Sequence, residues 1–160
     1  MKKKYGFKGD MTKDEYIISQ LRIHNSTYCS VGLTKAEMYE LLDKENVSFK
    51  KSEEWNSLFT KILDLEGITL DGLAKMKGIG VRSADYRNTF KITHADVKRL
   101  EKFGALTVIG TYTVREYGKY MYCPIYDLEQ FETMTKEDMQ KLLEEYPKGK
   151  RMISDNVRKR

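Results

Sequence analysis

Residues 90–106 have the sequence FKITHADVKRLEKFGAL and carry the clearest pattern in the chain. Val97 and Leu100 share one face of a helical repeat, with Ile92, Phe103 and Leu106 beyond its ends. Thr93 is a typical N-cap residue, and the free N–H groups behind such a cap favour a phosphate. The side chains predicted to face solvent are mostly basic: His94, Lys98, Arg99 and Lys102. This segment is therefore predicted to form a short amphipathic helix over about 93–103.

The flanking segments predict a second helix on one side and a hairpin on the other. Residues 83–90 have the length and pattern of a helix, and a tight turn at 91–92 follows. After residue 104 the pattern changes to alternation, which predicts one strand over 106–114, interrupted by Gly110, and a partner over 120–126. Residues 115–119 form the predicted turn, where Gly118 is free to adopt positive φ. The predicted order is helix, turn, helix, hairpin.

The rest of the chain is predicted to be helical. Three segments begin with an apolar residue, a Thr cap and an acid three residues later, at Met11, Leu33 and Met134. Predicted helices cover 12–24, 34–44, 52–66, 69–76, 127–132 and 135–146. The fold class is mainly α with a small β-hairpin (α+β). The predicted organisation is an N-terminal helical region over 1–66, the helix-turn-helix with its hairpin over 67–132, and a C-terminal helix with a basic tail over 133–160.

Residues 90–106 resemble the recognition-helix segment of the excisionase and MerR-like winged-helix families. In those families a run of the form LGISxxxVxRLxxxGxL leads into the hairpin, or wing, and here Lys91 stands where the family usually has Gly. Residues 127–131, DLEQF, are similar to the DLExF helix that follows the wing in excisionase-type domains. The resemblance covers about residues 82–132. Arg87 and Asn88 depart from it, since the family favours small apolar residues there, and residues 1–66 match nothing in it.

The resemblance implies a winged helix-turn-helix, in which the second helix enters the DNA major groove and the wing contacts the backbone or the minor groove. The residues that it assigns to DNA contact are Thr93, His94, Lys98 and Arg99 on the second helix and Arg115 and Lys119 on the wing. The neighbouring basic residues Arg82, Arg87 and Lys102 complete the predicted contact set. Arg and Lys pair either with guanine edges or with phosphates, and both roles stay open for these residues.

A second nucleic-acid motif overlaps the first. Residues 73–84, LAKMKGIGVRSA, resemble a helix-hairpin-helix, in which the backbone N–H groups of a GIG turn bind a DNA phosphate. The alternative interpretation of the same residues is a glycine-rich connector between helices.

The charge distribution favours a partner with a phosphate backbone. The chain has 160 residues and a net charge of +5, and residues 67–126 alone carry 10 Lys and Arg against 5 Asp and Glu. Residues 147–160 form a second basic stretch. No P-loop, GxSxG or HExxH motif occurs, and Cys29, Cys123, His24 and His94 have no zinc-ligand spacing. No enzymatic activity, metal or cofactor is expected.

The sequence therefore predicts a cytoplasmic, sequence-specific DNA-binding protein, with double-stranded DNA as its partner. A transcription regulator and a recombination accessory factor of the kind that phages and mobile elements encode both fit. The alternative is a phage-type inhibitor or adaptor, anti-CRISPR-like, that docks on a nucleic-acid-handling host protein. No membrane segment is predicted. The helix over 135–146 either packs on its own domain or forms a homodimer contact.

Overall fold

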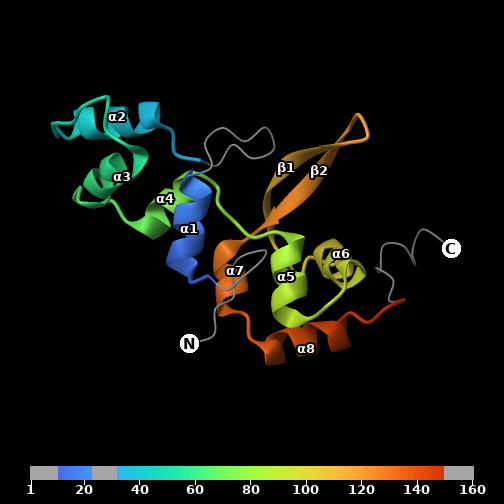
Figure 1. The fold of residues 1–160 in the computed structure, drawn as a ribbon. Coiled ribbons are helices and arrows are strands. Elements are labelled where there is room, and N and C mark those ends of the chain that lie inside the picture. The colour runs from blue at the N-terminus through green and yellow to red at the C-terminus, as the bar shows by residue number, and fades with distance from the viewer. Residues whose placement is uncertain (1–10, 23–31, 150–160) are drawn as a thin grey trace. The chain divides into compact units, whose positions relative to one another are not determined.

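The computed structural model of the chain describes residues 11–22 and 32–149 (Figure 1). Their helices are α1 Lys13–Arg22, α2 Lys35–Lys44, α3 Trp55–Leu63, α4 Leu70–Met76, α5 Ser83–Phe90, α6 His94–Lys102, α7 Leu128–Thr133 and α8 Lys136–Glu145. The strands β1 Val108–Glu116 and β2 Lys119–Tyr126 pair in a two-stranded sheet. The predicted α+β class is confirmed. None of the described helices is long and apolar enough to cross a membrane.

The described residues divide into two compact units. The first comprises 11–79 and the outer part of the hairpin, 112–123, and the second comprises 80–111 and 124–149. The predicted boundaries at 66/67 and 132/133 do not coincide with these units. The first unit extends past residue 67 because α4 packs on α1, and the second continues past residue 133 because α8 packs on α6.

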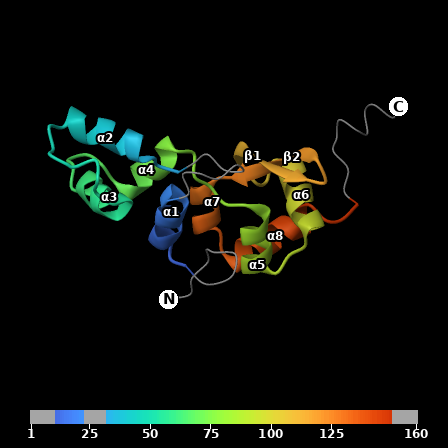
Figure 2. The same ribbon diagram turned by 45° about the horizontal axis from the view of Figure 1, so that its top comes forward.

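Apolar helix faces form the core of the first unit. Helix α3 buries Trp55, Leu58, Phe59 and Ile62, and it lies beside α2, as Figures 1 and 2 both show. Helix α3 begins at Trp55, with Glu54 as its N-cap, rather than at the predicted Ser52. Leu63, the last residue of the helix, is 37% exposed. The predicted end of the first helix at His24 lies outside the described residues.

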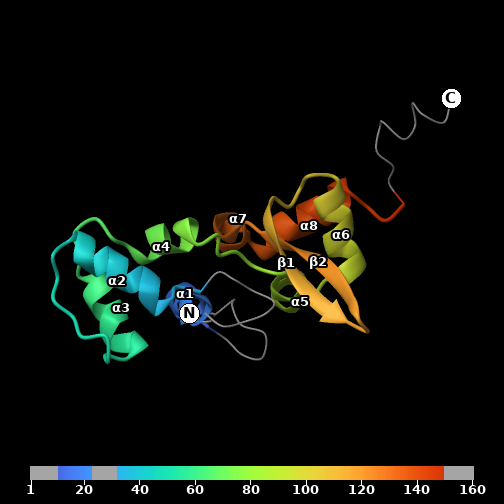
Figure 3. The ribbon, with the colours of Figure 1, turned by 90° about the horizontal axis from the view of Figure 1, so that it is seen from above.

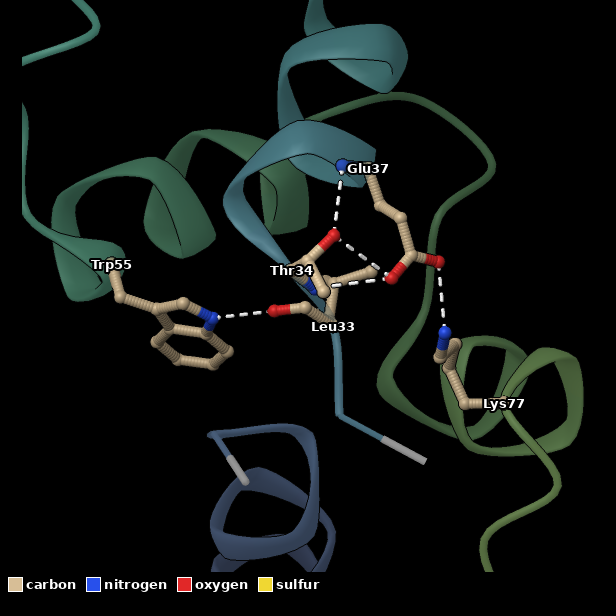
Figure 4. A network of polar contacts seen from close by, with 5 residues as sticks. All are labelled: Leu33, Thr34, Glu37, Trp55 and Lys77. Atoms are coloured by element: carbon tan, nitrogen blue, oxygen red, sulfur yellow. Dashed lines mark hydrogen bonds and ion pairs between the residues drawn. The ribbon is translucent and has the colours of Figure 1, made fainter. Parts of the chain in front are cut away.

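A capping network fixes the start of α2 (Figure 4). The Thr34 hydroxyl accepts a hydrogen bond from the Glu37 N–H at 3.2 Å, and the Glu37 carboxylate accepts one from the Thr34 N–H at 3.1 Å. The same carboxylate pairs with Lys77 at 2.8 Å, while the Trp55 indole donates to the Leu33 carbonyl at 2.7 Å. Partial burial raises the pKa of Glu37, but the bonds from Lys77 and Thr34 outweigh it and leave the pKa below 4.5. This network joins the beginning of α2 to Trp55, which is 22 positions after Leu33, and to Lys77, which is 40 positions after Glu37.

An aromatic cluster holds the second unit together. The Tyr86 ring contacts Tyr126 and Phe131 edge-on, with centroids 5.6 and 4.9 Å away, and stacks on Phe90. Tyr86, Tyr126 and Phe131 are all 0% exposed. Figure 1 shows the ribbons of α5, α6 and α8 close to one another in this unit. Helix α8 turns Met139, which is 2% exposed, toward its own unit.

The hairpin has a shorter turn than predicted. Only Tyr117 and Gly118 separate the strands, and both have positive φ, 52° and 76°. Such a pair is typical of a type I′ turn, whose twist matches that of the strands. The predicted five-residue turn is wrong, because Arg115, Glu116 and Lys119 all belong to the strands, and Gly110 does not interrupt β1. Figure 3 shows the two strands side by side along their length.

Candidate nucleic-acid interface

Helix α6 presents an exposed basic line to solvent. His94, Lys98 and Lys102 are each four residues apart and all exposed, so they lie along one side of the helix. Val97 and Leu100, on the opposite side, are 0% exposed. The predicted inward and outward faces are confirmed at these five positions. We call His94, Lys98 and Lys102 the α6 basic line.

Arg99 does not belong to this line, which corrects the prediction that it faces solvent. Its side chain is 15% exposed and pairs with Asp96 at 2.8 Å. Its Nε also donates to the backbone carbonyl of Tyr146 at 2.7 Å. A guanidinium held by two acceptors inside the unit stabilises the packing of α8 on α6. The structure thus gives Arg99 a role in the fold.

The N-terminus of α6 is already occupied by a carboxylate. The Thr93 hydroxyl accepts from the Asp96 N–H at 3.1 Å, and Asp96 accepts from the Thr93 N–H at 3.0 Å. The bond from the Thr93 backbone is the main cause that lowers the pKa of Asp96, and the Arg99 guanidinium adds to it. The phosphate-binding role predicted for this helix start therefore meets an ionised acid, which opposes a second anion.

The acidic groups around α5 and α6 are engaged within the unit. Asp85 is 7% exposed, and one of its oxygens accepts from the Arg82 N–H at 2.9 Å. Glu101 accepts from the Tyr126 hydroxyl at 2.6 Å and pairs with Lys98 at 3.4 Å. Both carboxylates thus accept hydrogen bonds within the unit, and the charge of Glu101 is opposed by that of Lys98.

Several cations of the same unit lack such a partner. Within the described residues, no ion pair involves Arg87 in the last turn of α5, Lys91 in the turn, or Lys102, and all three are exposed. Lys91 was not among the predicted contact residues. It adopts a left-handed conformation, with φ of 56°, where the family has Gly. The sequence did contain a sign of this additional cation, because Lys91 departs from the family motif at this position.

Three of the predicted contact residues on the two helices also make local contacts. Arg82 is the half-buried N-cap of α5. The His94 ring lies on the α5 side of its helix start, with Nδ1 3.3 Å from the Ser83 hydroxyl. Thr93 uses its hydroxyl in the α6 cap.

The two wing residues belong to a different compact unit from the other predicted contact residues. Arg115 and Lys119 are exposed and lie on the outer hairpin, which groups with the first unit, whereas the other seven predicted residues lie in the second. The Arg115 guanidinium lies over the Tyr120 ring, 5.6 Å from its centroid. The exposed tyrosines of this hairpin were not among the predicted contact residues, although their alternation is visible in the sequence.

Two amides of the glycine-rich segment 78–80, and the amide that follows it, form hydrogen bonds within the protein. The Gly78 and Ile79 N–H groups donate to Lys75 and Ala74, at 3.2 and 2.9 Å. The Val81 N–H donates to the Tyr126 carbonyl at 2.9 Å, in an isolated antiparallel bridge. Since these donors are used internally, the hydrogen bonds favour the connector interpretation of this segment over the phosphate-binding one.

Comparison with protein-family models, curated proteins and solved structures finds no match to this chain. In the part of the chain that the structure describes, no group of three or more His, Cys, Asp or Glu side chains could hold a metal ion.

Proposed function

We propose that the chain is a sequence-specific DNA-binding protein, a transcription regulator or a recombination accessory factor of the phage or mobile-element type. Helices α5 and α6 followed by the hairpin have the order of a winged helix-turn-helix, and α6 takes the place of the helix that enters the major groove. Double-stranded DNA is the proposed partner.

The α6 basic line is the observation that carries this proposal. His94, Lys98 and Lys102 lie on one side of a helix whose other side is buried, and Ala95 beside them is exposed and small. A helix with a slim, basic outer face is suited to a groove lined by phosphates. Arg87 and Lys91 add positive charge from α5 and the turn, and neither forms an ion pair within residues 11–22 and 32–149.

The experiment compares duplex affinity and salt dependence for two charge-matched double variants of the full chain. Lys98→Ala with Lys102→Ala removes two lysines from α6, and Lys136→Ala with Lys141→Ala removes two exposed lysines from α8. Removal of one phosphate-binding lysine should reduce the slope of log affinity against log salt by roughly 1. We expect a lower affinity and a shallower slope for the α6 variant only.

An equal loss of duplex affinity in the two variants would mean that only the net charge matters. It would overturn the assignment of α6 as the DNA-contacting helix. Thermal unfolding of both variants is the control for folding. The Lys98–Glu101 pair is solvent-exposed, so its removal should change stability by about 1 kcal/mol at most.

A further inference from the structure

The outer hairpin has two faces of different chemistry. Because the turn has two residues, Glu116 pairs with Lys119, which sets Arg115 opposite Tyr120 and Thr113 opposite Tyr122. The guanidinium of Arg115 over the Tyr120 ring agrees with this register. Side chains alternate along a strand, so these four residues share one face and Glu116, Lys119 and Met121 share the other. We call the first the tyrosine face.

The rings of the tyrosine face are open to solvent. Tyr120 is 61% exposed and Tyr122 is 75% exposed. They are two residues apart on one strand, a spacing of about 7 Å. Aromatic rings presented in this way on a strand are typical platforms for stacking successive unpaired bases.

The charge of the tyrosine face favours a polyanion. Arg115 is its only ionisable group besides the two phenols, since Glu116 falls on the other face. The aliphatic side chains of the outer hairpin, Val114 and Met121, also fall on the other face. The Thr, Tyr and Arg side chains of this face suit hydrogen bonds to phosphates and stacking against bases.

We propose that the tyrosine face binds single-stranded DNA, with two bases stacked on Tyr120 and Tyr122 and a phosphate near Arg115. Its residues belong to the first unit, whereas the α6 basic line belongs to the second. The choice of DNA over RNA rests on the proposed function, in which α6 enters the major groove of duplex DNA. The major groove of A-form RNA is deep and narrow and does not admit side chains in this way. The stacking itself does not depend on α6.

The test measures binding of the full chain to a fluorescein-labelled 15-mer of thymidine by anisotropy at low salt. Tyr120→Ala and Tyr122→Ala should each weaken binding about tenfold, the typical effect of removing one stacked base. The corresponding Phe variants keep the ring and should bind like the parent. Met121→Ala, 49% exposed and on the other face, is the matched control. Unchanged melting temperatures exclude misfolding.

Each result bears on one claim. Equal weakening in Met121→Ala, or unchanged binding in the Tyr→Ala variants, would overturn the proposal, as would failure of the parent to bind the 15-mer. Tighter binding of the uridine 15-mer would overturn the choice of DNA. Weaker binding of the thymidine 15-mer by the Tyr→Ala variants, with duplex binding intact, supports the proposed site on the tyrosine face. The Lys98→Ala, Lys102→Ala variant tests the proposed function separately, since it should lose duplex binding and keep 15-mer binding.

Discussion

The Nε of Arg99 donates to the backbone carbonyl of Tyr146 at 2.7 Å, a bond between residues 47 positions apart. The Tyr146 ring also stacks on Phe103, with centroids 5.3 Å apart. The end of α6 and the end of α8 are thus joined by a charged hydrogen bond and a ring contact. Arg99 differs in this respect from Lys98 and Lys102 of the same helix, which face solvent.

This arrangement predicts that Arg99→Ala destabilises the fold. The variant leaves Asp96 without its ion pair and the Tyr146 carbonyl without this donor. A hydrogen bond to a charged group contributes about 1.5–3 kcal/mol, so we expect a decrease of about 2 kcal/mol in the free energy of unfolding. Urea unfolding followed by circular dichroism measures it.

Lys102→Ala is the control for Arg99→Ala, since it removes an exposed cation from the same helix. Its unfolding free energy should change by less than about 0.5 kcal/mol. Equal effects of the two variants would contradict the role assigned to Arg99.

Gly80 should not tolerate a side chain. A Cβ at this position would lie 2.2 Å from the Tyr126 carbonyl oxygen and 2.6 Å from Ile125 Cγ2. Since the first obstacle is backbone, Gly80→Ala must displace the bridge between Val81 and Tyr126, and we expect a destabilisation of about 2–3 kcal/mol. Gly110→Ala is the matched control, because a Cβ there meets nothing within 4 Å. A Gly80→Ala protein with the parental melting temperature would refute this packing.

Tyr86→Phe should be neutral or stabilising. The Tyr86 hydroxyl is buried and has no hydrogen-bond partner among the described residues. An unsatisfied buried hydroxyl costs about 1–3 kcal/mol, and the phenyl ring keeps its packing on Tyr126 and Phe131. Calorimetry should therefore give an equal or higher melting temperature. A marked decrease would mean that the hydroxyl has a partner.

The same residue gives a pH dependence of known sign. Burial raises the pKa of Tyr86 above its ordinary value of 10.0, and the nearby Asp127 raises it further. The neutral phenol is thus favoured in the folded state, and the stability that goes with it is present below pH 10 and lost as the pH rises above it. Tyr86→Phe should lose less stability than the parent between pH 9 and pH 11. Parallel curves would contradict this.

Lys91→Gly should stabilise the protein. Lys91 has φ of 56°, a region that is unfavourable for any residue with a Cβ. Relief of this strain should raise the free energy of unfolding by about 0.5–1 kcal/mol. Lys98→Gly removes the same charge inside α6 and should lower it by about 1 kcal/mol. The opposite signs in chemical denaturation are the expected result, and destabilisation in both variants would argue against the left-handed turn.

Local signals in the sequence predicted the helices well. Thr34, Thr93 and Thr135 are the N-caps of α2, α6 and α8, as predicted. These caps were predictable because a cap depends on residues only three positions away. Features that depend on distant residues were not predictable in the same way. Arg99 could not be separated from Lys98 because its acceptor on Tyr146 comes 47 residues later.

The prediction of the hairpin turn failed for a different reason. Tyr117 has φ of 52°, and a Tyr at positive φ has no signature in the sequence, so only Gly118 marked the turn. Among the predicted contact residues of α6, helical periodicity correctly selected His94, Lys98 and Lys102 as exposed. The acid at the start of α6 was not predicted, although Asp96 comes three residues after Thr93, which is the spacing of a capping box.

Selection of duplex DNA from a random-sequence pool by the full chain, at 50 and 200 mM salt and followed by sequencing, tests the central claim most directly. We predict that a defined motif is enriched and that retention decreases steeply with salt, by roughly tenfold or more if several phosphates are bound. Symmetry in the motif would indicate a homodimer. Failure to retain duplex DNA even at 50 mM salt would contradict the account and favour a protein partner, to be sought by pull-down with the α6 variants as controls.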